Sequence, residues 1–369
     1  MAIIDTLFKI TADQGASDLH LAVGAPPMLR LRGHLKTVEY PPLTEEVLRP
    51  MLYEILTESQ IEGFEKRHDL DFSYSAPGIA RFRANYYRKH TGIAAAFRFI
   101  PFKVLTLDQI GAPDVFKHLC GFRNGLVVVT GPTGSGKSTT LSALIHHINA
   151  NSNEHIITLE DPLEFIHEPI QCMISQREVG GHTDSFATGL RAALREDPDV
   201  VLVGEMRDLK TIQLAITAAE TGHLVFGTLH TNSAAKTVDR IIDVFPPDRQ
   251  AQVRTMLSES LRGVIAQQLL RRANGKGRVA AYEVLVATPA VRALVREQKT
   301  FQLPSIIATG RKEGMQTLDQ CLLDLAQKQV VSPQEALDYA DAPSILAAKL
   351  SYSPPATPAP PPLLNNFQS

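Results

Sequence analysis

A glycine-rich segment between an apolar run and a helical pattern constrains the fold of this chain more than any other feature. Residues 131–138, Gly-Pro-Thr-Gly-Ser-Gly-Lys-Ser, match the GxxxxGK[ST] pattern of a phosphate-binding loop. The apolar run 126–129 before the loop is typical of a buried strand, and apolar positions in 141–148 repeat at the spacing of one helix face. Strand, glycine loop and helix in this order predict a nucleotide-binding α/β domain.

The residue types of this loop suit a polyphosphate better than an ordinary glycine turn. Glycines let backbone N–H groups converge on phosphate oxygens, and the start of the following helix adds partial positive charge. Lys137 adds a full positive charge, and the Ser138 hydroxyl is a ligand for Mg²⁺. The predicted nucleotide-binding residues are Gly131, Pro132, Thr133, Gly134, Ser135, Gly136, Lys137, Ser138 and Thr139.

Composition excludes several classes of protein. The 369 residues suit two domains, and a net charge of −2 disfavours a dedicated nucleic-acid binder. Three cysteines without a C-x-x-C pair argue against disulfides and a cysteine zinc site, and they suit a reducing cytoplasm. We expect neither a membrane-spanning helix nor a signal peptide, because no long apolar run occurs and residues 1–10 lack a basic flank.

The pattern along the chain divides it into four parts. Residues 1–100 mix short helices and strands and predict a small α+β domain, followed by a linker at 101–113. Residues 114–350 alternate strands with helices, which predicts a mostly parallel sheet covered on both faces, with helices at the end. The tail 351–369 holds six prolines and no charge, so we expect it to be disordered.

Periodicity places the individual elements. In the first part we predict an amphipathic helix at 1–10, a helix from Thr44, and strands within 17–21, 27–35, 81–86 and 94–100. In the larger part we predict strands at 126–130, 155–159, 200–204, 224–229 and 279–286, and helices at 184–195, 209–220 and 249–269.

Two acidic segments follow predicted strands of the larger domain. Strand 155–159 runs into a segment that holds Glu160, Asp161 and Glu164, and strand 200–204 is followed by Glu205. Ligands of an open α/β sheet bind beyond the carboxyl ends of its strands, where the phosphate loop also lies. A carboxylate there can orient water or balance Mg²⁺, although a solvated loop carboxylate is the alternative for any single residue. The strand before Glu205 lacks the usual terminal aspartate, which weakens its assignment to metal.

Two histidines bracket the predicted strand 224–229. His223 and His230 are seven residues apart, so on a regular strand they face opposite ways and do not share a metal. His230 follows the carboxyl end and can reach a γ-phosphate, whereas a structural role is as good a reading for His223.

Three arginines in the first domain are candidates for a more distant role. Arg81 and Arg83 share one face of a strand, and Arg98 lies on the next strand. A solvated sheet face is the ordinary interpretation. The alternative is that they reach a nucleotide on another subunit. An arginine supplied in trans raises the rate of hydrolysis by a factor of about 10³–10⁵.

Four motifs together resemble the secretion and pilus ATPases of the type II/type IV family, over a region from near the N-terminus to about residue 340. They are the phosphate loop, an acidic Asp box at 158–165, a Walker B region at 197–208 and a His box at 221–231. The resemblance implies ATP and Mg²⁺ as ligands and a RecA-like P-loop NTPase domain after a PAS-like α+β domain. It also implies a homohexamer.

The same resemblance implies roles for individual residues. Glu164 matches the general base, Glu205 the Walker B glutamate that acts on Mg²⁺ directly or through water, and His230 the phosphate-sensing histidine. Arg83 and Arg98 best match the arginines that approach the nucleotide from the N-terminal domain, with Arg81 close behind. Strand alternation alone does not choose among the three.

Within the family, the chain is most similar to the retraction ATPases of type IV pili. Assembly and secretion ATPases usually carry a longer N-terminal region and a four-cysteine zinc element, and this chain has neither. Residues 290–297 resemble the AIRNLIRE motif of retraction ATPases, with Arg292 and Arg296 on one helix face.

The resemblance also implies a biological setting. It implies a motor that hydrolyses ATP to depolymerise pilin and support twitching motility, at the cytoplasmic face of the inner membrane at the pilus base. Implied partners are an inner-membrane platform protein and a second retraction ATPase, without stably bound nucleic acid. The alternatives are an accessory retraction ATPase, a related secretion or assembly ATPase, a RecA-like nucleic-acid translocase and a non-hydrolysing scaffold.

Overall fold

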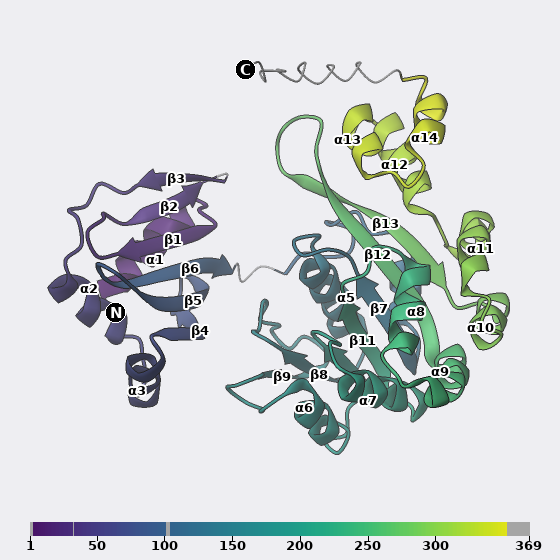
Figure 1. Ribbon diagram of the computed structural model, residues 1–369, viewed down its shortest axis with the longest axis horizontal. Helices are drawn as coiled ribbons and strands as arrows, with labels where there is room; N and C mark the ends of the chain where they lie inside the picture. Colours follow the sequence, from purple (N-terminus) through teal and green to yellow (C-terminus); the bar gives the residue numbers. More distant parts are fainter. Residues whose placement is uncertain (1–2, 32, 101–103, 353–369) are drawn as a thin grey trace, which may run out of the picture. The chain divides into compact units, whose positions relative to one another are not determined.

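The computed structural model describes residues 3–31, 33–100 and 104–352 (Figure 1). The predicted disordered tail, 351–369, lies outside the described residues except for its first two, and so does the start of the predicted linker. The chain divides into two compact units, one of residues 1–109, 120–126 and 138–228 and the other of residues 110–119, 127–137 and 229–369. The predicted domain boundaries stay predictions.

The first sheet is antiparallel and, among the described residues, has six strands in the order β3-β2-β1-β6-β5-β4. Its strands are β1 (Asp18–Ala22), β2 (Met28–Leu31), β3 (His34–Thr37), β4 (Asp69–Ala76), β5 (Ala80–Lys89) and β6 (Gly92–Ile100). The helices of this part are α1 (Ile3–Asp13), α2 (Glu45–Tyr53) and α3 (Glu58–Arg67). The predicted strand 27–35 is two strands, β2 and β3, and the patterns we read did not predict β4 or α3.

One face of this sheet forms an aromatic core with α1. Phe8 of α1 is fully buried, and its ring stacks on Phe82 of β5 with 4.1 Å between centroids. Phe97 of β6 meets Phe8 edge-on at 4.9 Å. Residues alternate in β5, so Phe82 is buried while Arg83 is exposed on the opposite face. The core thus fixes which face of the sheet presents the arginines.

The second sheet has seven strands in the order β13-β12-β7-β11-β10-β8-β9 among the described residues. Its strands are β7 (Gly125–Thr130), β8 (His155–Glu160), β9 (Met173–Glu178), β10 (Val200–Val203), β11 (Leu224–Leu229), β12 (Leu261–Arg271) and β13 (Arg278–Val286). The pairs β11–β10, β10–β8 and β8–β9 are parallel, and β12–β13 is antiparallel. Every residue of β7, β10 and β11 is buried, which confirms a mostly parallel sheet covered on both faces.

The remaining helices lie between residues 115 and 350. They are α4 (Val115–Cys120), α5 (Lys137–Asn151), α6 (Phe186–Ala193), α7 (Leu209–Glu220), α8 (Ala234–Asp243), α9 (Pro247–Ser260), α10 (Pro289–Arg296), α11 (Leu303–Thr309), α12 (Leu318–Gln327), α13 (Pro333–Tyr339) and α14 (Pro343–Leu350), with the 3₁₀ turns η1 (Thr300–Gln302) and η2 (Arg311–Glu313). None of the described helices is long and apolar enough to cross a membrane.

The predicted helix at 249–269 is wrong in its second half. Helix α9 ends at Ser260, and residues 261–271 form β12, which pairs with β13 from Gly263 to Arg271. A short apolar run fits a buried strand as well as a buried helix, so periodicity could not separate them. Gly263 of β12 also packs closely against a residue that is far away in the sequence. A Cβ at Gly263 would lie 2.8 Å from Leu119 Cδ2.

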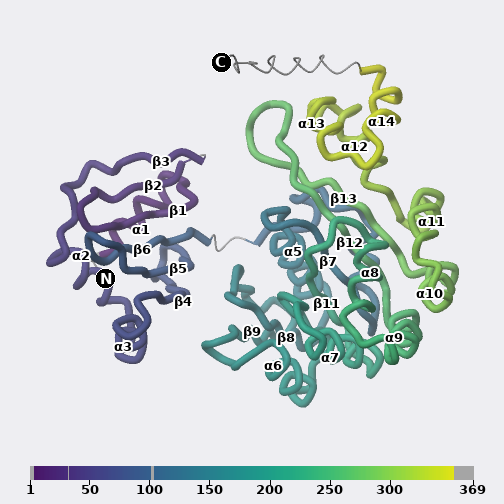
Figure 2. The backbone as a smooth tube through the Cα atoms, viewed as in Figure 1, coloured from purple at the N-terminus to yellow at the C-terminus, as the bar shows by residue number. Residues whose placement is uncertain are grey.

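The C-terminal helices pack on the β12–β13 hairpin. Leu270 of β12 and Ala281 of β13 share a buried cluster with Leu318 and Leu322 of α12 and Leu346 of α14. The tube in Figure 2 shows α12, α13 and α14 grouped beside this hairpin. The hairpin therefore links these helices to the sheet, in which β13 is an edge strand and β12 lies next to β7.

Candidate functional site

The phosphate-binding loop follows β7 and leads directly into α5, as predicted. Gly131, Gly134 and Gly136 have φ values of 147°, 79° and 88°, which side chains with a Cβ rarely adopt. Pro132, Thr133 and Gly134 are exposed, and Ser135 is buried. The loop therefore bends through glycines and presents its tip to solvent, above the N-terminus of α5.

Lys137 begins α5 and folds back over the loop. Its Nζ donates hydrogen bonds to the carbonyl oxygens of Gly131 at 2.8 Å and Pro132 at 3.1 Å. The same Nζ lies 3.5 Å from Nδ1 of His230. The sequence predicted both residues as phosphate contacts, and the structure brings their side chains together. Ser138 and Thr139, also predicted as site residues, lie in the first turn of α5 and are half-buried.

Strand β12 supports the loop from beneath, which sequence reasoning missed. The buried Gln267 donates from Nε2 to the Ser135 carbonyl oxygen at 2.5 Å. A Cβ added at Gly131 would overlap the Gln267 carbonyl oxygen, and one at Gly136 would lie 3.2 Å from Nε2. Glycine at these positions thus permits close contact with β12. Residues 261–269 had been predicted as helix, so no sequence signal pointed to Gln267.

The carboxyl ends of β7 and β11 are joined by threonines. Thr130, the last residue of β7, donates from Oγ1 to the Thr231 carbonyl oxygen at 2.8 Å and accepts from the Thr231 N–H at 2.9 Å. Thr231 Oγ1 in turn lies 2.6 Å from Oγ1 of Thr237 in α8. His230 precedes Thr231, so these bonds fix its position beside the phosphate loop.

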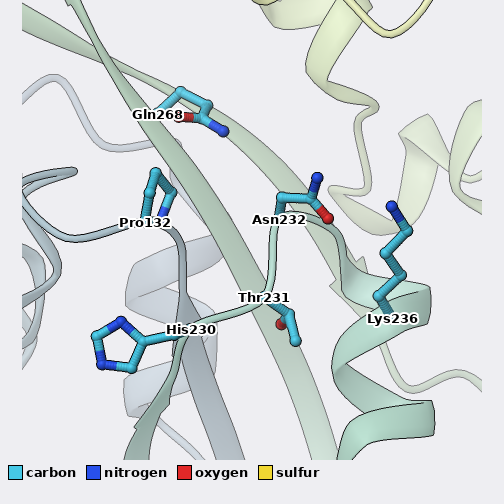
Figure 3. Close-up of a pocket in the computed structure, with 6 residues that line it drawn as sticks. All are labelled: Pro132, His230, Thr231, Asn232, Lys236 and Gln268. Carbon is cyan, nitrogen blue, oxygen red and sulfur yellow. The ribbon is translucent and has the colours of Figure 1, made fainter.

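A cavity of ≈ 520 Å³ lies beside the loop. It is lined by Pro132, His230, Thr231, Asn232, Lys236 and Gln268 (Figure 3). In Figure 3, Lys236 extends from the start of α8, and His230 lies on the other side of Thr231, near Pro132. The lining carries the positive charge of Lys236 together with polar groups of His230, Asn232 and Gln268, which suits an anionic ligand.

The start of α8 is anchored to β13 by a buried carboxylate. Ser233 caps the helix by accepting from the Lys236 N–H, and Glu283 Oε1 accepts from the Ala234 N–H at 2.6 Å. Burial raises the pKa of Glu283, because a charged carboxyl loses hydration there. This contact holds the helix that carries Lys236 against the sheet.

The acidic residues at the end of β8 and just after it differ in exposure: Glu160, the last residue of the strand, is half-buried, whereas Asp161 and Glu164 are exposed. Burial raises the pKa of Glu160 to about 7, although hydrogen bonds from Thr158, from the Glu164 N–H and from Gln176 act in the opposite direction. Glu164, the predicted general base, is exposed four residues later. The segment thus combines a shielded carboxyl with a solvent-facing one.

Glu205 follows β10, as predicted, and its carboxylate contacts a neighbouring cation. Arg207 Nε lies 2.5 Å from Glu205 Oε1, and the Glu205 side chain is 19% exposed. The loop is tied to both neighbouring strands, since Gly204 N–H donates to the Leu159 carbonyl at 2.7 Å and Thr228 Oγ1 donates to the Gly204 carbonyl at 2.5 Å. No group of three or more His, Cys, Asp or Glu residues suited to a metal occurs in the described part of the chain.

The three candidate arginines share one sheet face, with different partners. Arg81 donates to Glu178 at 2.6 Å, and its side chain is 11% exposed. Arg98 pairs with Asp18 at 3.1 Å and stays 69% exposed. Arg83 lies opposite Arg98 in the β5–β6 register and is exposed, and no ion pair is recorded for it within residues 3–31, 33–100 and 104–352.

The other sequence candidates lie away from the loop or face solvent. His223 immediately precedes β11, and its Nδ1 is 3.0 Å from the Ala218 carbonyl oxygen, a structural contact. In α10, Arg292 donates from Nε to the Ala287 carbonyl oxygen at 3.0 Å, whereas Arg296 is exposed. Val291 and Val295 form the buried face of this helix.

Comparison with known proteins agrees with this geometry. Residues 2–338 match the family described as Type II/IV secretion system protein. The chain is 52% identical over 340 residues to the type IV pilus retraction ATPase PilT of Pseudomonas aeruginosa, covering 92% of this chain and 98% of that protein. It is 51% identical over 310 residues to a twitching motility protein of Neisseria gonorrhoeae, covering 84% and 83%.

A solved structure extends the similarity to three dimensions. The crystal structure of the pilus retraction motor PilT with bound ADP superposes with a TM-score of 0.88 at 44% identity. The match covers 94% of this chain and 99% of that one. The antiparallel first sheet and the mostly parallel second sheet are therefore those of this structural group.

Proposed function

Because the chain belongs to the family of type II/IV secretion system proteins, we propose that it is an ATPase motor that retracts type IV pili and supports twitching motility. The observation that carries the proposal is the phosphate loop, with Lys137 and His230 side by side at its mouth. The similarity to retraction ATPases over nearly the whole chain supports pilus retraction as the biological function. In this proposal the first part is PAS-like and the second RecA-like.

In the proposed site, the loop amides and Lys137 bind the phosphates of ATP. The exposed loop tip and the α5 N-terminus suit a polyphosphate, since both offer N–H donors and positive potential. The Ser138 hydroxyl and Glu205 provide oxygen ligands, which Mg²⁺ prefers, and Mg²⁺ is usually held by few protein ligands together with phosphate oxygens. When bound, the metal neutralises charge on the phosphates.

Hydrolysis in this proposal uses groups that follow the strands. Glu164, exposed beyond β8, accepts a proton from the attacking water. His230 contacts the terminal phosphate, and its position next to Lys137 supports that role. The strand order β7-β11-β10-β8 supports the assignment, because the phosphate loop, His230, Glu205 and Glu164 each follow one of these strands.

We further propose that the motor is a homohexamer in which an arginine reaches the nucleotide of a neighbouring subunit. Arg83 suits this role best, because it is exposed while Arg81 and Arg98 form ion pairs with Glu178 and Asp18. The proposed partners are an inner-membrane platform protein and a second retraction ATPase, at the cytoplasmic face of the inner membrane. Stable nucleic-acid binding is not expected at a net charge of −2.

Replacement of Lys137 tests the ATPase proposal. Lys137→Ala should abolish ATP turnover and pilus retraction, while the matched Lys276→Ala, in the exposed β12–β13 turn, should keep both. The measurements are the steady-state ATPase rate of the purified protein and pilus retraction in cells. Wild-type turnover by Lys137→Ala would refute the site, and an inactive wild-type assembly would refute the ATPase.

Mixing experiments test the shared site. Lys137→Ala and Arg83→Ala subunits should each be inactive alone, and mixed hexamers should regain part of the rate because some interfaces then hold both residues. Arg88→Ala, an exposed arginine of the same strand, is the control and should retain activity alone. Absence of rescue at every mixing ratio would contradict a site completed in trans.

A further inference from the structure

The segment between β8 and β9 is held at several backbone positions by side chains of β9. The parallel strands lie side by side (Figure 1), with Gln176 opposite Thr158 and Glu178 opposite Glu160. Gln176 and Glu178 are two residues apart, so they point to the same face of the strand. That face meets the segment on which Glu164 lies.

Gln176 bonds to this segment through both ends of its amide. Its Nε2 donates to the Phe165 carbonyl oxygen at 2.8 Å, and its Oε1 accepts from the His167 N–H at 2.8 Å. The same Nε2 lies 3.4 Å from Glu160 Oε1. One side chain thus fixes two peptide groups on the C-terminal side of Glu164.

The N-terminal side of Glu164 is fixed as well. Glu178 Oε2 accepts from the Leu163 N–H at 3.1 Å, and Glu160 Oε2 accepts from the Glu164 N–H at 3.4 Å. Leu163 and His167 are buried, while Glu164 between them is exposed. The backbone on both sides is therefore anchored, although the Glu164 carboxylate faces solvent.

We propose that Gln176, assisted by Glu178, is a positioning residue that holds the Glu164 carboxylate in its working orientation. The inference rests on the proposed function, in which Glu164 is the base. An exposed carboxylate on a loose segment would sample many positions, and a displacement of about 1 Å from the attacking geometry can cost on the order of 10²-fold in rate. Anchoring three neighbouring peptide groups removes that freedom before the nucleotide binds.

The variant that tests this is Gln176→Met. Methionine keeps the length of the side chain and removes both amide hydrogen bonds, whereas Glu178 is a poorer target because it also binds Arg81. The control is Gln213→Met on the exposed side of α7. We expect Gln176→Met to lower kcat by about 10- to 100-fold with KM and nucleotide affinity within about twofold of wild type. The control should match wild type throughout.

A double-mutant cycle separates positioning of Glu164 from a general effect on the fold. Single-turnover rates are measured for wild type, Gln176→Met, Glu164→Ala and the double variant. Adding Gln176→Met to Glu164→Ala should cause no further loss. An equal loss in both backgrounds, or an unchanged kcat in Gln176→Met alone, would overturn the proposal.

Hydrogen exchange supplies a readout that does not depend on turnover. Gln176→Met should speed amide exchange in peptides that cover 161–168, with exchange in the phosphate loop unchanged. Unchanged exchange in 161–168 would overturn the proposal. Full activity of Glu164→Ala would overturn it too, and would leave the ATPase itself intact. An inactive wild-type protein would instead show that the proposed ATPase function is wrong.

Discussion

The half-buried carboxyl of Glu160 gives the protein a pH-dependent stability that a single substitution should remove. Burial raises its pKa from the usual 4.5 to about 7. The folded state therefore holds a proton over a pH range in which the unfolded chain has released it. Stability from this group is fully present below the unfolded pKa of 4.5 and is lost as pH rises through the folded pKa of about 7.

The size of the effect follows from the same pKa change. Each pH unit between the folded and unfolded pKa corresponds to about 1.4 kcal/mol, so the full range gives ~3 kcal/mol. Glu160→Gln removes the titrating group and keeps one oxygen, which can accept from Thr158 Oγ1, while its amide nitrogen replaces the oxygen that accepts from the Glu164 N–H. The loss of that second hydrogen bond does not depend on pH. The free energy of unfolding of the variant should therefore rise relative to wild type as pH increases, by ~2–3 kcal/mol between about pH 5 and pH 8.

The assay is urea denaturation of both proteins across this pH range, with the difference in unfolding free energy plotted against pH. Other titrating groups cancel in the difference. Glu168→Gln, an exposed carboxylate of the same segment, is the control and should give a flat line. A flat line for Glu160→Gln, or a difference that falls as pH rises, would refute the argument from burial.

Three further predictions concern the loop, a helix cap and the aromatic core. Gly131→Ala should weaken ATP binding at least about tenfold, because its Cβ would overlap the Gln267 carbonyl oxygen, and Gly134→Ala, with open space around its Cβ, should lose less. Equal losses in a nucleotide titration would contradict the steric argument. Asp208→Ala should cost ~1 kcal/mol in urea denaturation, because the Asp208 carboxylate caps α7, and Asp208→Asn should lose less; equal losses would exclude the cap. Phe8→Ala should cost ~3–5 kcal/mol, since its ring is fully buried, and a loss below about 1 kcal/mol would show that the core adjusts.

Much of the candidate site could be predicted because its signals are local. The phosphate loop, the strand before it and the helix after it are contiguous along the chain. The spacing of the loop's glycines, lysine and serine is the spacing that a phosphate-binding loop requires. The acidic segments and His230 could be placed at strand ends because buried parallel strands read as continuous apolar runs. Strand alternation likewise placed Arg81 and Arg83 on one face.

The errors occurred where the decisive contacts join distant residues. The run after Ser260 is apolar enough for a helix or a strand, and pairing with β13 makes it β12. Strand β9 is an edge strand whose residues do not alternate clearly between apolar and polar, so the sequence pattern did not predict it. Gln176 on that strand therefore could not be seen as a neighbour of the segment that holds Glu164.

The amino-acid sequence by itself determined that this chain carries a phosphate loop between a buried strand and a helix, since those features depend on residues adjacent along the chain. Only the folded structure shows which side chains support that loop and which of the three arginines form ion pairs. Gln267 reaches Ser135 across 132 residues, and Arg81 reaches Glu178 across 97. Strand pairing and packing bring such partners together in space. Because the partners are far apart along the chain, no local sequence pattern indicates the contact.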